Sequence, residues 1–337
     1  MRLTRSDLGA DGIRRRRCGR GFRYLAAGAP VTDPRTLARI KALVIPPAWE
    51  DVWICADPRG HVQAVGTDSA GRRQYRYHDL WREQRDRDKH DRVLGLGAAL
   101  PHVREVVGRH LDGRGLTRDR VLATAVRLID LGFFRPGGEE YAEENGTFGL
   151  ATILKEHVSL AKGQLTFDYT AKGAKHREQA VAEDQVCAAV RSLKRRPGGG
   201  EKLLAYRNGR GWHDVTAAEI NDYIREVSGS DYTAKDFRTW HATVLAAVGL
   251  AVSRHARSES ARKRAIARVV REVAGYLGNT PAVARASYID PRVIRRYENG
   301  HTIAAILGDL GKDSHFGDLA TRGRAEGAVL KLLALPS

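Results

Sequence analysis

The sequence predicts an α+β protein of two domains, a small N-terminal antiparallel sheet domain and a mainly helical C-terminal domain with a small three-stranded sheet. The chain has 337 residues, enough for about two domains. Short apolar and aromatic runs between turn signals fill 51–77, whereas apolar residues at helical spacing dominate from about Leu96 onward. The almost wholly charged segment from Arg82 to Arg92 separates the two patterns as an exposed helix or a hinge. We place the boundary there, giving domains 1–90 and 91–337.

The N-terminal strands are predicted from short runs such as Val52-Trp53-Ile54-Cys55, which the turn signals Asp57-Pro58-Arg59-Gly60 and Asp68-Ser69-Ala70-Gly71 separate. The run Arg14-Arg15-Arg16-Arg17 is either a phosphate-binding arm or a disordered basic tail, and we favour the tail.

Within the C-terminal domain, which is predicted to be mainly helical from about Leu96, a helix is expected over 117–131, and Thr117 is its plausible cap. Gly149 to Lys175 then interrupts the helical pattern, because 157–160 and 165–169 read as strands on either side of a turn.

Two later helices have clear boundaries. Thr216 and Glu219 form a capping box that opens a helix to about Val227. An Arg-rich helix is predicted from Glu259 to Leu277, and Gly278-Asn279-Thr280-Pro281 ends it and begins the next helix.

The charge of the chain indicates an anionic partner. Lys plus Arg number 57 and Asp plus Glu 40, a net charge of +17, and 45 of the basic residues are Arg. Arginine suits planar, bidentate phosphate recognition, so nucleic acid is the favoured partner and an anionic membrane the second. Coding bias in a GC-rich genome is the remaining explanation for the excess of Arg.

Several other classes of protein, namely membrane, secreted, metal-binding and nucleotide-binding proteins, are excluded because the sequence lacks their features. Its longest mainly apolar run, Ala242 to Val252, is too short to span a membrane, and no signal sequence is recognisable. The three cysteines lie far apart, and no CxxC pair, His cluster or acidic cluster suggests a metal site. No GxxxxGK[ST] loop for nucleotide phosphates is present. We therefore expect no metal and no cofactor.

Phosphodiester chemistry without metal needs a nucleophile, cations for the non-bridging oxygens and an acid for the leaving oxygen. Five candidates occur in suggestive contexts. They are Arg135 in a Pro/Gly turn after an apolar helix, Lys172 at a hairpin tip, Arg238 in Lys235-Asp236-Phe237-Arg238, Asn279 at a helix stop and Tyr288 on a short helix.

Together these five sites, in this order, resemble the type IB DNA topoisomerases, especially the small bacterial and poxvirus members. The N-terminal part carries two further typical motifs, Ile45-Pro46-Pro47-Ala48-Trp49 and Gly71-Arg72-Arg73-Gln74-Tyr75-Arg76-Tyr77. The resemblance covers nearly the whole chain. It implies a two-domain clamp around duplex DNA.

The resemblance also implies a role for each site. Tyr288 would attack a DNA phosphate and form a 3′-phosphotyrosyl link, and resealing would then need neither ATP nor metal. Arg135 and Arg238 would hold the non-bridging oxygens, and Lys172 would protonate the leaving 5′-oxygen if nearby cations lower its pKa. Asn279 replaces the His of many relatives, so we expect it to donate a hydrogen bond and not to exchange a proton.

Further DNA contacts are implied for Arg73, Gln74, Tyr75 and Tyr141. Gly138 departs from the poxvirus pattern, in which a Lys at this place contacts a base, so the cleavage preference of those enzymes does not carry over. We expect a monomer whose partner is duplex DNA and which does not bind a membrane. We expect it in the cytoplasm, associated with the nucleoid.

Two other readings remain open. A tyrosine recombinase shares the fold and the Arg-Lys-Arg-Tyr chemistry, but it usually has His at the place of Lys235, and its N-terminal domain is helical. A non-enzymatic basic protein that coats DNA would explain the charge of +17 but not the ordered set of five sites.

Overall fold

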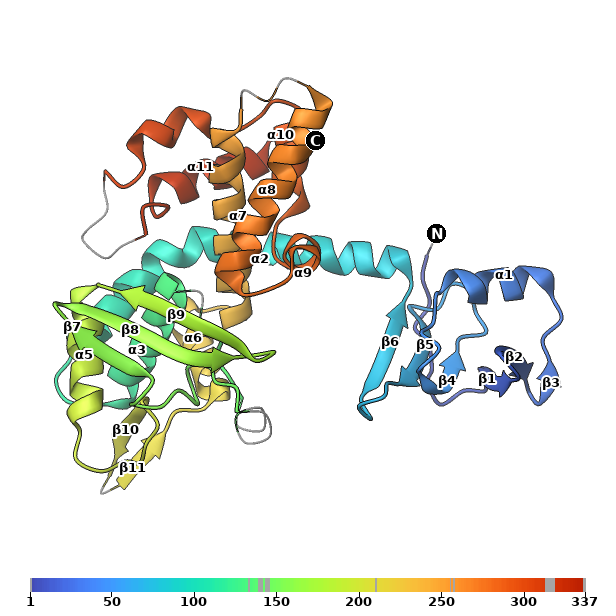
Figure 1. Cartoon of the computed structure of the whole chain (residues 1–337), viewed down its shortest axis with the longest axis horizontal. Coiled ribbons are helices and arrows are strands. Elements are labelled where there is room, and N and C mark those ends of the chain that lie inside the picture. Colours follow the sequence, from blue (N-terminus) through green and yellow to red (C-terminus); the bar gives the residue numbers. More distant parts are fainter. Residues whose placement is uncertain are drawn as a thin grey trace. The chain divides into compact units, whose positions relative to one another are not determined.

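A computed structural model describes residues 2–132, 134–138, 142, 146–209, 211–254, 256, 258–312 and 319–335. It divides the chain into two compact units, Met1–His90 and Asp91–Ser337 (Figure 1). Each unit has its own hydrophobic core. The segment from Arg82 to Arg92 is helical and belongs to α2 (Asp79–Leu111), which resolves the choice between a helix and a hinge.

The first unit is built on a six-stranded antiparallel sheet with the order β3-β2-β1-β4-β5-β6. Its elements are β1 (Ile13–Cys18), β2 (Gly21–Ala26), β3 (Ala29–Pro30), α1 (Pro34–Ala42), β4 (Glu50–Ile54), β5 (Val62–Thr67) and β6 (Arg73–Tyr77). The strands predicted within 51–77 are confirmed.

Both faces of this sheet are buried at its centre. Alternation along β4 sends Val52 and Ile54 to a core that includes Ile40 of α1. It sends Trp53 to the other face, where Leu8 packs against a second small cluster. A continuous apolar run can therefore form a central strand here, because the N-terminal segment covers the face that α1 does not.

The prediction of a disordered basic tail is wrong. Arg14, Arg15, Arg16 and Arg17 lie in β1, which pairs with β2 along its whole length and with β4 at its start. Ile13, which is buried in the core, anchors the strand. Tertiary pairing thus orders a segment whose composition alone suggests disorder.

The second unit combines helices with a three-stranded antiparallel sheet, β7-β8-β9, and a two-stranded ribbon, β10-β11. The strands are β7 (Val158–Ala161), β8 (Gln164–Ala171), β9 (Lys175–Val181), β10 (Ala205–Asn208) and β11 (Gly211–Asp214). The helices after α2 are α3 (Arg118–Gly132), α5 (Asp184–Arg195), α6 (Ala217–Ser228), α7 (Ala234–Val252), α8 (Glu259–Leu277), α9 (Pro281–Ser287), α10 (Pro291–Glu298), the 3₁₀ helix η1 (Ala304–Asp309) and α11 (Arg324–Ala334).

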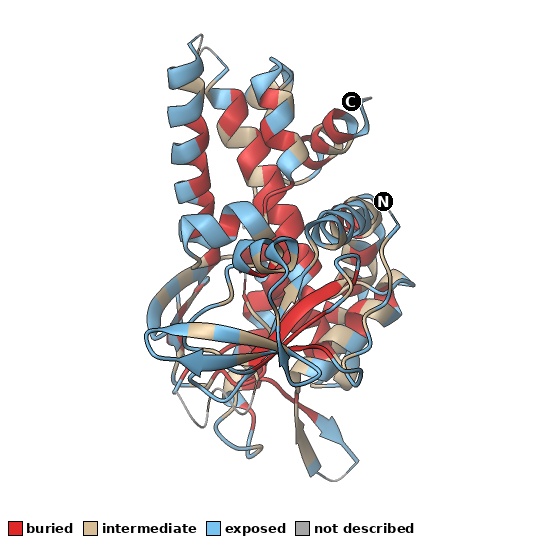
Figure 2. Ribbon diagram, turned by 90° about the vertical axis from the view of Figure 1, so that its right-hand side faces the viewer, coloured by how far each residue is buried: buried red, intermediate tan, exposed pale blue. Residues whose placement is uncertain are grey.

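Local signals set several of these boundaries. The capping box of Thr216 and Glu219 starts α6, Gly278 ends α8 in a left-handed conformation, and Thr280 caps α9. Figure 2 shows the buried residues gathered on the inner sides of the helices and the exposed residues on the outer sides. The predicted α+β fold with its small three-stranded sheet is confirmed, while the closing of a clamp stays a prediction.

Candidate active site

Arg238 projects into the interior about one turn after α7 begins. The start of α7 is fixed by Asp236, whose Oδ2 accepts a hydrogen bond from the backbone N–H of Thr233 at 2.9 Å. Phe237 is fully buried, and Arg238 is only 3% exposed. Its Nη2 donates to the carbonyl oxygen of Leu277 at 2.8 Å. The Lys-Asp-Phe-Arg motif thus starts a helix and aims a guanidinium at the end of α8.

Arg135 lies in the turn that follows α3, and backbone contacts fix this turn. Its carbonyl accepts a hydrogen bond from the N–H of Leu150 at 2.9 Å. Phe134 packs edge-on against Phe167 of the sheet, with ring centres 4.9 Å apart. Gly137 has φ +87° and approaches Gly149 so closely that a Cβ would lie 2.9 Å from its Cα. This turn gives the guanidinium of Arg135 a rigid base.

The last turn of α8 brings these arginines together. The N–H of Asn279 donates to Ala274 O at 2.9 Å and the N–H of Gly278 to Gly275 O at 3.0 Å, which is a Schellman motif. The carbonyl of Leu277 stays available and accepts from both Arg238 and, at 3.3 Å, Arg135. Cations are favoured at this end of a helix because its dipole is negative there.

Asn279 lies between Arg135 and the proposed nucleophile. Its Oδ1 accepts a hydrogen bond from Arg135 Nη2, which fixes the orientation of the amide because arginine has no acceptor. Its Nδ2 is buried and has no hydrogen-bond partner of normal geometry among the described residues. The amide therefore presents a buried donor toward the site.

Tyr288 follows α9 directly and faces Arg238. The guanidinium carbon of Arg238 lies 5.5 Å from the centre of the Tyr288 ring. The backbone after Tyr288 is held by Thr243 of α7, whose Oγ1 accepts from the N–H of Asp290 at 3.1 Å. One helix, α7, thus carries an arginine and also positions the segment that holds the tyrosine.

The site is electrostatically prepared for an anion. Burial, followed by the charge of Arg135, lowers the pKa of Arg238 to about 10. Burial is also the main cause that lowers the pKa of Arg135. Because these shifts mean that the charged guanidiniums are poorly stabilised, an entering phosphate would gain strongly from both.

The same charges act on Tyr288. Burial alone would raise the pKa of its phenol, but the charge of Arg238, the amide of Asn279 and the charge of Arg135 outweigh burial and lower it. Asn279 is thus near enough to stabilise the phenolate, although its Nδ2 does not reach normal hydrogen-bond geometry. The surroundings of Tyr288 therefore favour its phenolate, which is the nucleophilic form.

A buried charge network joins α3, which Arg135 follows, to α7, which carries Arg238. Asp130 of α3 accepts from His241 of α7 at 3.0 Å and from Arg322 at 2.6 Å. Burial would raise the pKa of Asp130, but the charges of Arg104 and Arg322 and the hydrogen bond from His241 hold it well below its usual range. The network fixes the end of α3 relative to α7.

Lys172 is more exposed than the other four candidates, Arg135, Arg238, Asn279 and Tyr288. It is exposed in the turn between β8 and β9. Lys175, at the start of β9, donates from Nζ to the carbonyl of Gly278 at 3.3 Å. The hairpin that carries Lys172 is therefore docked next to Asn279.

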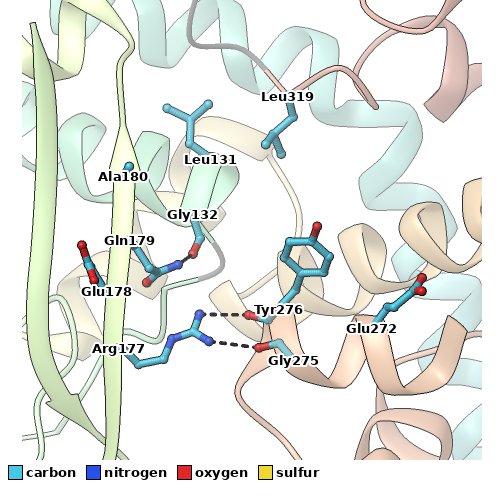
Figure 3. A pocket seen from close by; sticks show the side chains of 10 residues that line it. All are labelled: Leu131, Gly132, Arg177, Glu178, Gln179, Ala180, Glu272, Gly275, Tyr276 and Leu319. Carbon is cyan, nitrogen blue, oxygen red and sulfur yellow. Dashed lines mark hydrogen bonds between the residues drawn. The ribbon is translucent and has the colours of Figure 1, made fainter. Parts of the chain in front are cut away.

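Arg177 is a residue that the sequence analysis missed. Its Nη1 donates to Gly275 O at 3.2 Å and its Nη2 to Tyr276 O at 2.9 Å (Figure 3). It lines a cavity of about 500 Å³ between β9 and the end of α8. Alternation along β9 could have marked it as a cation beside Lys175, but its partners lie 98 and 99 residues away along the chain.

The proposed DNA-contact residues Arg73, Gln74 and Tyr75 lie on β6 of the first unit. Tyr75 and Tyr77 stack with ring centres 6.0 Å apart and are both exposed, and Arg73 lies over the Tyr75 ring. Gln74 points to the other face, where its amide donates to Asp68 at 2.9 Å. Tyr141 lies outside the described residues.

Within the described ranges, no group of three or more His, Cys, Asp or Glu side chains could hold a metal ion. In the same ranges, no helix has the length and apolar character that crossing a membrane requires.

Two family models match the chain. One, described as the catalytic core of eukaryotic DNA topoisomerase I, matches residues 78–305, more than half of the chain. The other, described as the N-terminal domain of bacterial DNA topoisomerase IB, matches residues 21–68.

Individual relatives agree with these models. DNA topoisomerase 1B of Acanthamoeba polyphaga mimivirus is 28% identical over 306 residues, which cover 86% of this chain and 88% of the viral protein. DNA topoisomerase 1B of vaccinia virus (strain Copenhagen) is 20% identical over 232 residues, which cover 68% of this chain and 70% of that protein. Among solved structures, the XerH site-specific recombinase bound to its palindromic difH substrate is 17% identical, with a TM-score of 0.37 over 62% of this chain and 51% of that chain.

Proposed function

Because the chain belongs to the type IB DNA topoisomerase family, whose members relax duplex DNA by strand cleavage, we propose that it cuts one strand through a 3′-phosphotyrosyl intermediate and then reseals it. The observation that carries this proposal is the convergence of Arg135, Arg238 and Asn279 beside Tyr288, whose pKa is lowered there.

In the cleavage step, the Tyr288 oxygen attacks the phosphorus of a DNA phosphodiester. A bond forms between this oxygen and phosphorus, and the bond from phosphorus to the 5′-oxygen breaks. The phenolic proton is lost to solvent, and the leaving 5′-oxygen gains a proton from Lys172. Resealing reverses each transfer, with the 5′-hydroxyl as the nucleophile and Tyr288 as the leaving group.

Two arginines and one amide stabilise the charge that develops on the phosphoryl oxygens. Arg135 and Arg238 supply forked, charged donors from rigid bases. The buried Nδ2 of Asn279 supplies a neutral donor, and a non-bridging oxygen would satisfy it.

Lys172 is assigned the role of general acid. Its exposed place in the hairpin turn supports this role, because an acid must reach a strand that arrives from solvent. The contacts of Lys175 and Arg177 hold the same hairpin against the end of α8.

We also infer that β6 contacts DNA through Arg73, Gln74 and Tyr75, and that Tyr141 contributes a further contact. The exposed Tyr75 beside Arg73 supports this role, since it offers an aromatic face and a phosphate donor together. One chain carries all five proposed catalytic residues, so we infer that it acts as a monomer on DNA in the nucleoid.

The covalent intermediate conserves the energy of the broken phosphodiester, and arginine and lysine charges stabilise the reaction. We therefore predict that the chain relaxes a supercoiled plasmid in excess chelator and without nucleotide. Agarose electrophoresis of the topoisomers measures this directly. A strict requirement for magnesium or ATP would contradict the proposed mechanism.

A further inference from the structure

The arginine run in β1 has a structural consequence that the catalytic proposal does not use. Arg14, Arg16 and Arg23 are all exposed, and strand alternation places Arg14 and Arg16 on one face of β1. Arg16 and Arg23 are direct cross-strand partners in the β1–β2 register, so Arg23 shares that face. We call these three residues the arginine face.

Such an arrangement costs stability. Like charges placed directly opposite each other on a sheet repel. Arg15, on the other face, is satisfied in the folded chain, since it donates to the carbonyl of Pro46 at 3.1 Å and stacks over Phe22 at 4.1 Å. Among the residues that the structure describes, none of the three members of the arginine face has an ion pair.

Protection of a sheet edge accounts for this charge only in part. Charged side chains often guard edge strands against aggregation. However, β1 lies between β2 and β4, and β3 covers part of the outer edge of β2. Because β1 pairs with β4 only at Ile13 and Arg14, Arg14 lies where the strand is paired on both sides, whereas Arg16 lies beyond that pairing and Arg23 lies outside the part of β2 that β3 covers. Edge protection thus leaves the charge of Arg14 unexplained.

We propose that the arginine face binds the phosphate backbone of duplex DNA. Guanidinium groups bind phosphate with forked donors, and contacts to the backbone alone are independent of sequence. Three uncompensated charges on one short ribbon are complementary to a polyanion, and DNA is the polyanion on which this family acts. This contact is distinct from Arg73, Gln74 and Tyr75, because β6 is the opposite edge strand of the sheet.

The inference rests on duplex DNA as the substrate but not on the chemistry of Tyr288. Its signature is the salt dependence of binding, since each neutralised phosphate contributes about −0.9 to the slope of log K against log salt. Loss of three such contacts would make the slope smaller in magnitude by about 2 to 3.

The test compares two triple variants of the full chain. One is Arg14→Gln/Arg16→Gln/Arg23→Gln. The control is Arg59→Gln/Arg82→Gln/Arg118→Gln, which removes the same charge from three arginines that each have a carboxylate partner already. Binding to a labelled duplex is titrated at several salt concentrations, and melting curves verify that each variant is folded.

We expect the smaller slope only in the arginine-face variant, together with an unchanged rate of covalent adduct formation at saturating DNA. The variant with Lys at the same three positions should keep the slope, because it keeps the charge. Equal slopes in the arginine-face variant and the control would overturn the proposal. Loss of binding to anionic phosphatidylserine vesicles with intact binding to DNA would assign the face to a membrane instead. If the wild type forms no covalent adduct with DNA, only the proposed role of Tyr288 is refuted, and the proposal for the arginine face stands.

Discussion

Asn279 lies between Arg135, which is proposed to bind phosphate, and Tyr288, the proposed nucleophile. One end of its amide accepts from Arg135, and the other end is a buried donor that lowers the pKa of Tyr288. An amide has no proton to exchange at neutral pH, so we propose that Asn279 contributes to catalysis through charge stabilisation alone.

Substitutions of Asn279 test whether its side chain acts as a hydrogen-bond donor or transfers a proton. We expect Asn279→Ala to slow cleavage by about 100-fold or more, the usual cost of losing an oxyanion donor. It should also move the rising limb of the pH–rate profile to higher pH, because the phenolate loses a stabilising partner and the pKa of Tyr288 rises. Single-turnover cleavage measured across pH tests both effects.

Asn279→His serves as the matched variant, since a ring N–H can also donate. It should keep substantial activity. If the wild type, the Ala variant and the His variant cleave at equal rates, Asn279 has no role in the reaction.

At the scale of elements, the β8–β9 hairpin and the end of α8 form one assembly. Arg177 holds two carbonyls of the last turn of α8, and Lys175 holds a third. The strand pairing runs through Ala171 and Lys175, directly next to the turn that holds Lys172. We therefore infer that Arg177 is a positioning residue for the proposed general acid.

This assignment predicts a substrate-dependent defect. Arg177→Ala should slow cleavage of ordinary DNA at least about tenfold, and by less than Lys172→Ala, because a misplaced acid transfers its proton less well. With a sulfur atom in place of the leaving 5′-oxygen, the rate should recover, since a thiol of pKa about 8.5 leaves without protonation.

The matched control for this experiment is Arg135→Ala. The Arg135→Ala variant should lose stabilisation of the non-bridging oxygens. Its slower cleavage should therefore persist on the sulfur-containing substrate. An Arg177→Ala defect of the same size on both substrates would show that Arg177 does not act through the acid.

Local chemistry made many of the elements predictable. Gly278 and Thr280 mark the end of α8 and the start of α9 through backbone preferences that depend only on neighbouring residues. The capping box of Thr216 and Glu219 does the same for α6.

Elements and residues that depend on distant partners were not predictable. Four consecutive arginines hide the alternation of β1, and only its pairing with β2 and β4 makes it a strand. Arg177 gains its importance from the end of α8, and Asp130 from Arg104, His241 and Arg322. The five candidate catalytic residues were found as a resemblance to a family, and sequence spacing alone does not bring them together.

At the scale of the whole molecule, the net charge of +17 includes arginines with different roles. Arg104 is paired with Asp130 and Glu326 in the interior, and Arg196 closes a loop through backbone carbonyls. Arg135 and Arg238 converge on one helix end, beside the proposed nucleophile. Binding to DNA should depend on the remaining exposed arginines, and cleavage on these two.

The proposed reaction depends above all on Tyr288 as the nucleophile. The most direct test is to mix the protein with labelled duplex DNA, denature it and look for a covalent complex on a gel. Wild type should give this complex with the label on the 3′-phosphate side, whereas Tyr288→Phe should bind the duplex but give none. Tyr276→Phe is the matched control, because Tyr276 is exposed on the last turn of α8, and it should behave as wild type. A covalent complex formed by Tyr288→Phe would contradict the account.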